Sequence, residues 1–205
     1  MFTELDHNRI VAMTDQERRW LNNIKKAIYE ADRAYAGGSP QDRCFEEMCK
    51  AADTAKTLRR SLLGAEYSDQ SNKRLFTEFL DLEVPTPERG GMNLVLFDSR
   101  KGCQVRYSFS SLIYCIRCMV HENENLNAAE QPDYHVLLDW TMNPNDRHAG
   151  FLEDGAVKLN ARLIWMRLRE VVTKFVWGLE AVLAVERGGG FEMNRELCSI
   201  RPDGV

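Results

Sequence analysis

The longest uninterrupted helical pattern in the chain covers residues 160–186. Apolar residues recur there three and four positions apart, which places them along one side of an α-helix. A stripe of this length and width is buried only when several other elements pack against it. We therefore expect a long helix whose apolar side forms the centre of the core. The stripe consists of Ile164, Leu168, Val171, Val172, Phe175, Leu179, Val182 and Leu183.

Two further long helices are expected near the N-terminus. The first covers residues 14–36, where Thr14 and Glu17 form a capping box at its start. The second covers residues 39–63 and follows after only two glycines. Such a short link predicts that the two helices form an antiparallel hairpin. The residues expected on the buried side of the second helix are Phe45, Met48, Cys49, Ala52, Ala55, Leu58 and Leu62.

Two short β-rich segments interrupt the helical patterns. Residues 94–98 (LVLFD) and 103–107 (CQVRY) are strand-like and flank the turn SRKG, which predicts a β-hairpin. Residues 134–140 are strand-like, and residues 150–160 predict a second hairpin around Asp154-Gly155. With further helices at about 68–84 and 109–121, we expect a mainly α protein. The predicted architecture is one domain over residues 1–205, a bundle of about five helices with small β-insertions at about 94–107 and 134–159.

Composition limits the classes of protein that remain. The net charge of −4 and the isoelectric point near 5.7 argue against a surface that follows nucleic-acid backbone throughout, but 27 lysines and arginines still allow a local basic site. The six cysteines are scattered and predict reduced thiols. No apolar run approaches the length of a membrane span, and the polar start does not resemble a signal peptide. We expect a soluble cytoplasmic protein with no membrane contact.

The helix at 109–121 carries the candidate functional residues. On a helical wheel its apolar residues fall within one arc, and Ser110, Tyr114, Arg117 and His121 fall within a second arc that reaches Asn125 if the helix continues. Such a stripe is most often a solvated helix face. An arginine beside a histidine also suits phosphodiester chemistry without a metal, because arginine binds phosphate and histidine transfers protons near neutral pH.

The segment Tyr114-Cys-Ile-Arg117-Cys-Met-Val-His121 resembles the HEPN superfamily of helical-bundle proteins. That family has an arginine followed, after four to six residues, by a histidine; here three residues intervene, and Cys118 follows the arginine. The resemblance implies a homodimer and a metal-independent ribonuclease of a toxin–antitoxin or defence system, without a cofactor. Arg117 and His121 would then be catalytic.

Residues around this pair are expected to bind the RNA. They are Ser110, Tyr114, Asn123 and Asn125. The family also contains non-catalytic members, so the alternative is a protein-interaction module without activity, such as the antitoxin-like half of a pair.

A third alternative is a metal-binding or small-molecule-binding bundle. Cys115, Cys118 and His121 have the spacing of a zinc half-site. On a continuous helix each step between them rotates about 60° around the axis, so the three ligands converge poorly. We therefore expect no metal at this site.

Overall fold

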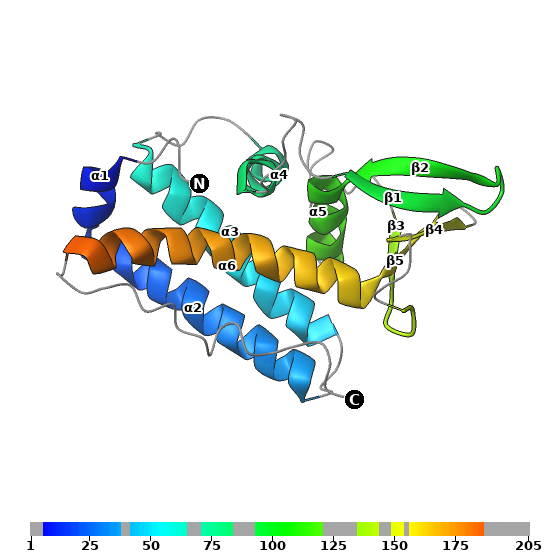
Figure 1. Ribbon diagram of the computed structural model, residues 1–205, viewed down its shortest axis with the longest axis horizontal. Coiled ribbons are helices and arrows are strands. Elements are labelled where there is room, and N and C mark those ends of the chain that lie inside the picture. The colour runs from blue at the N-terminus through cyan, green and yellow to red at the C-terminus, as the bar shows by residue number, and fades with distance from the viewer. Residues whose placement is uncertain are drawn as a thin grey trace.

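The computed structural model describes residues 6–37, 42–64, 71–83, 93–120, 135–143, 149–153 and 156–186. These residues form six helices and a five-stranded mixed sheet, an α/β fold (Figure 1). The prediction of a helical bundle with small hairpin insertions is therefore wrong. The helices were largely anticipated; the joining of the two β-segments into one sheet was not.

The N-terminal helices are arranged as expected. Helix α2 spans Asp15–Ala36 and α3 spans Asp42–Leu62. They pack side by side along their lengths (Figure 1). The capping box at Thr14 is confirmed: its hydroxyl accepts from the Glu17 amide, and the Glu17 carboxylate accepts from the Thr14 amide at 2.8 Å. All seven residues predicted for the buried side of α3 are buried.

Before α2 lies a short helix, α1 (His7–Val11), that was not predicted from the sequence. One turn of helix has too few residues for a periodic pattern, and its start depends on Asp6, whose side chain accepts from the Asn8 amide. Arg9 of this helix donates to the buried carboxylate of Glu17, which Ser61 of α3 also contacts through its hydroxyl at 2.6 Å. Glu17 therefore ties α1, α2 and α3 together.

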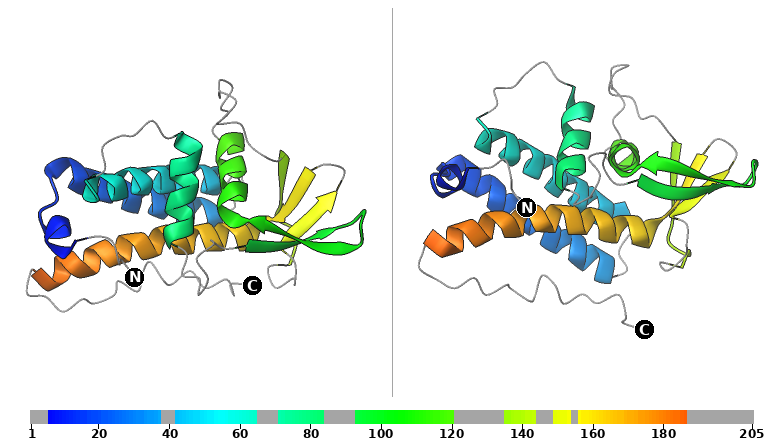
Figure 2. Two further views of the ribbon diagram at one scale, coloured as in Figure 1. Left: turned by 90° about the horizontal axis from the view of Figure 1, so that it is seen from above. Right: turned by 45° about the horizontal axis from the view of Figure 1, so that its top comes forward.

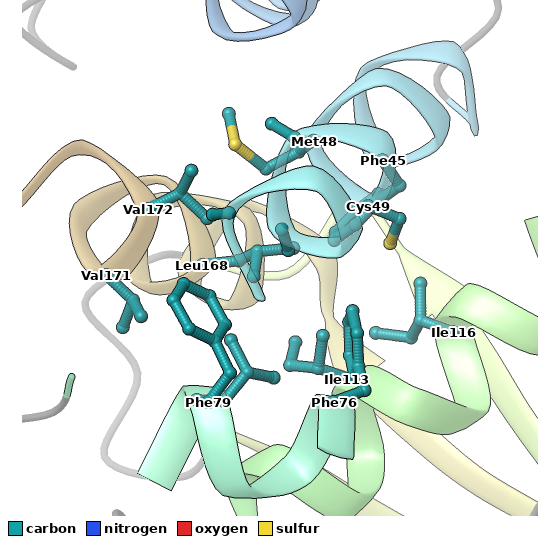
Figure 3. Packing of buried hydrophobic residues seen from close by; sticks show 14 of the residues in the cluster. Phe45, Met48, Cys49, Phe76, Phe79, Ile113, Ile116, Leu168, Val171 and Val172 are labelled. Carbon is teal, nitrogen blue, oxygen red and sulfur yellow. The ribbon is translucent and has the colours of Figure 1, made fainter. Parts of the chain in front are cut away.

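The long helix α6 (Ala161–Glu186) runs past α2, α3 and α4 (Asn72–Glu83). Six residues of its predicted stripe are buried, from Ile164 to Leu179, whereas Val182 and Leu183 are only partly buried. Figure 3 shows Leu168, Val171 and Val172 of α6 facing side chains of α3 and α4. Helix α5 (Phe109–Val120) completes this core with Ile113 and Ile116.

The five strands lie in the order β2-β1-β4-β5-β3 at one end of the helices (Figure 2). Their bounds are Asn93–Asp98 for β1, Cys103–Ser108 for β2, His135–Asp139 for β3, Gly150–Glu153 for β4 and Ala156–Asn160 for β5. The two expected antiparallel hairpins, β1–β2 and β4–β5, are both present. The two hairpins form one sheet because β1 pairs in parallel with β4. Strand β3 extends this sheet by pairing in parallel with β5.

Gly150 shows why that arrangement needs a glycine. A Cβ at this position would lie 2.2 Å from the carbonyl oxygen of Lys158 in the neighbouring strand. Only a residue without a side chain therefore allows β4 and β5 to approach this closely. In the part of the chain that the structure describes, no helix is long and apolar enough to cross a lipid bilayer.

Candidate functional site

Helix α5 is buried on nearly all sides, which the wheel did not predict. Ser110 is 1% exposed and Tyr114 0% exposed, whereas Met119 from the expected apolar arc is 41% exposed. The supposed solvent side of α5 is covered because α3 and α4 both pack against the helix. Ser110 and Tyr114 are therefore parts of the core and do not line an open cleft.

The strand-to-helix junction holds Ser110 in place. The hydroxyl of Ser110 is 2.8 Å from that of Ser108, which in turn accepts weakly from the Ser111 amide at 3.4 Å. Ser110 also hydrogen-bonds Asp81 of α4; burial nevertheless raises the pKa of Asp81 above its usual value. These contacts give Ser110 a structural place between β2, α4 and α5.

Arg117 lies in the last turn of α5 and reaches α3. Its Nε donates to Oδ2 of Asp53 at 2.7 Å, and only 11% of its side chain is exposed. Its guanidinium carbon lies 5.5 Å from the ring centre of Phe76 and 5.7 Å from that of Tyr114, within the range of cation–π attraction. Burial lowers the pKa of Arg117. The charge of Asp53 and its hydrogen bond to Arg117 raise this pKa, and the net shift is upward. The guanidinium is therefore permanently charged and fixed in position.

Asp53 is shared between two cations. Its other carboxylate oxygen, Oδ1, accepts from Nζ of Lys56 at 2.9 Å, and Lys56 also donates to the side chain of Asn72 in α4. The side chain of Lys56 is 11% exposed and that of Asp53 is 24% exposed. We call Arg117, Asp53 and Lys56 the Arg117 cluster. Its two positive charges share one carboxylate, which leaves a formal charge of +1 at the junction of α3, α4 and α5.

Three of the predicted site residues, His121, Asn123 and Asn125, lie outside the described residues. The pairing of Arg117 with His121 therefore stays a prediction. Asp53 and Lys56 were not among the predicted site residues. Their spacing of three residues on a helix favours an ion pair between them, but nothing in the sequence indicated which helix they would meet.

The cysteines of α3 and α5 are buried near this cluster. Burial, and next the charge of Asp53, raise the pKa of Cys49 far above its usual value, so its thiol stays protonated. Cys115 and Cys118 are also buried. Among the described residues, no three histidine, cysteine, aspartate or glutamate side chains are grouped to hold a metal ion.

Comparisons with known proteins add no family assignment. Family models, curated proteins and solved structures all give no match to this chain.

Proposed function

We propose that this chain binds RNA, with a backbone phosphate seated at the Arg117 cluster. The observation that carries the proposal is the sharing of Asp53 by Arg117 and Lys56, which leaves an excess positive charge in a partly buried place. A positive charge that is partly buried is stabilised by a negatively charged partner. The Arg117 cluster therefore favours the binding of an anion. In the described structure only Nε of Arg117 has a hydrogen-bond partner, and the terminal amino groups are the donors that fit a phosphate.

Binding is favoured over cleavage. Asp53 already compensates part of the charge of Arg117, whereas a ribonuclease needs that charge in full to stabilise the phosphate as it reacts. The resemblance of the Arg117–His121 segment to the HEPN superfamily supports RNA as the phosphate-bearing ligand. A homodimer and an antitoxin-like partner belong to this proposal as expectations from the same resemblance.

Binding of a fluorescent single-stranded RNA of mixed sequence, followed by anisotropy in a chelator, tests the proposal. We expect Arg117→Gln and Lys56→Gln each to weaken binding at least tenfold, because each removes a charged donor to phosphate. Competition with inorganic phosphate and with a DNA strand of the same sequence separates general phosphate binding from RNA binding.

Arg169→Gln is the matched control. Arg169 is also largely buried, pairs with Asp32 at 2.6 Å and lies over an aromatic ring, but it belongs to the interface of α2 and α6. Its loss is expected to leave RNA affinity unchanged. Equal affinity of Arg117→Gln and wild type, or no RNA binding by the wild type, overturns the proposal.

The cleavage alternative is tested in the same chelating buffer by following the length of the RNA on a gel. We expect intact RNA with the wild type and with His121→Ala. Cleavage by the wild type that His121→Ala abolishes would show that the site is catalytic and that binding alone understates its function.

A further inference from the structure

The sheet has one face on the core and one face turned away from it. Residues of β1, β3 and β5 alternate between the two faces, and Leu94, Leu96, Val136, Val157 and Leu159 are buried in the core. The described helices α5 and α6 pack against β2, β3 and β5. Figure 2 shows the β1–β2 hairpin extending beyond these helices.

Strand register places a row of side chains across the other face. From β2 to β3, the row consists of Gln104, Phe97, Phe151, Lys158 and Leu137, each opposite the next in the neighbouring strand. Beside this row, Arg106 of β2 lies opposite Val95 of β1. We call these seven residues the outer sheet face. Its four apolar residues lie outside the buried core. They are Val95, Phe97, Leu137 and Phe151.

Two aromatic rings lie at the centre of the outer sheet face. Phe97 and Phe151 are half-buried, with ring centres 6.4 Å apart and planes at 77°. Leu137 at the far edge is 49% exposed. Apolar and aromatic side chains that stay accessible side by side on a sheet are typical of a binding surface.

The charge next to these rings is positive, in a chain whose net charge is −4. Arg106 is exposed and, within the described ranges, forms no ion pair. At the tip of the same hairpin the Lys101 side chain is 72% exposed, and its Nζ lies 3.6 Å from Oδ2 of Asp98. The one carboxylate of the hairpin, Asp98, is buried and accepts from the backbone amides of Arg100 and Lys101 at 3.0 Å, so it stabilises the turn.

We infer that the outer sheet face is a platform for single-stranded RNA, on which Phe97 and Phe151 stack bases while Arg106 and Lys101 contact the backbone phosphates. Aromatic rings next to exposed cations fit this ligand because every base offers a flat apolar face and every linkage a negative charge. Lys158 is a weaker candidate for a phosphate contact, since its side chain is less exposed than that of Lys101 and pairs more closely, with Asp139 at 3.0 Å. The inference takes its ligand class from the proposed function, but it does not need Arg117.

The test compares two fluorescent probes, a single-stranded oligoadenylate and an abasic oligomer of the same length. Phe97→Leu and Phe151→Leu keep an apolar side chain and remove the stacking surface. We expect each to weaken oligoadenylate binding roughly 5- to 100-fold and to leave the abasic probe unaffected, because stacking needs the bases. Arg106→Gln is expected to weaken both probes. Thermal melting followed by circular dichroism shows whether each variant is folded, and Phe79→Leu in the core is the control for a Phe-to-Leu change away from the platform.

The outcomes separate this inference from the proposed function. If Arg117→Gln weakens both probes while the phenylalanine variants bind like wild type, the platform is wrong and the phosphate site stands. If the phenylalanine variants weaken oligoadenylate binding and Arg117→Gln does not, the platform stands and the phosphate site at Arg117 is wrong. Loss of a homodimer in sedimentation velocity on replacing Phe151, with unchanged RNA affinity, overturns the inference and identifies the face as an interface between copies.

Discussion

Nε of Arg117 donates to Oδ2 of Asp53 at 2.7 Å, which joins the last turn of α5 to the middle of α3. Asp53 is bound on its other oxygen by Lys56, so the carboxylate orients two cations but compensates only one. This arrangement distinguishes the Arg117 cluster from the ion pair of Asp32, which accepts two hydrogen bonds from the single cation Arg169.

The buried carboxylate of Glu17 makes stability depend on pH. Burial raises its pKa, but hydrogen bonds from Arg9, Ser61 and Thr14 outweigh burial and lower it from 4.5 to about 2. Because the folded pKa lies below the unfolded one, the stabilisation is complete above about pH 4.5 and is lost as the pH falls toward 2. The shift corresponds to roughly 3 kcal/mol. We expect Glu17→Gln to lower the free energy of unfolding near pH 7 by about that amount and to flatten its fall in acid.

Urea unfolding followed by circular dichroism at neutral and acidic pH measures this effect. Asp15→Asn is the control, since Asp15 is exposed in the same helical turn and is expected to cost about 0.5 kcal/mol. A Glu17→Gln variant as stable as wild type near pH 7 contradicts the role assigned to Glu17.

Gly150 is expected to tolerate no side chain. In Gly150→Ala the new methyl group meets the backbone carbonyl of Lys158, and neither strand can move without breaking the register. We expect a loss of about 3 kcal/mol, at the upper end for overpacking. Gly102→Ala is the comparison. The φ of +64° at Gly102 is strained for alanine, but no atom lies within 4 Å of the new methyl group. This substitution is expected to cost about 1 kcal/mol. Equal losses in denaturant unfolding argue against the close approach of β4 and β5.

The elements with local causes could be predicted from the sequence. The stripe of α6, the capping box of α2 and the buried side of α3 follow from spacing along one helix. The parallel pairing of β1 with β4 could not be predicted, because it joins residues about fifty positions apart and alternation is the same in an isolated hairpin.

The same limit applies to the candidate site. Arg117 was identified from the pattern of its own helix. The helical wheel, however, was interpreted as having only one buried side. The packing of α4 and α3 on α5 buried Ser110 and Tyr114, and it brought Asp53 to Arg117 from a position 64 residues away. Partners that meet only through tertiary packing leave no pattern in either segment.

The RNA affinity of Asp53→Asn tests the central claim most directly. The substitution keeps the shape of the side chain and raises the formal charge of the Arg117 cluster from +1 to +2. If the cluster binds a phosphate, RNA binding measured by anisotropy should tighten roughly three- to tenfold even though the protein melts at a lower temperature. Asp32→Asn, which makes the same charge change at the Arg169 ion pair, should lower the melting temperature without changing the affinity. A lower melting temperature of Asp53→Asn with unchanged or weaker RNA binding would contradict the account and reduce the Arg117 cluster to an ion pair that only stabilises the fold.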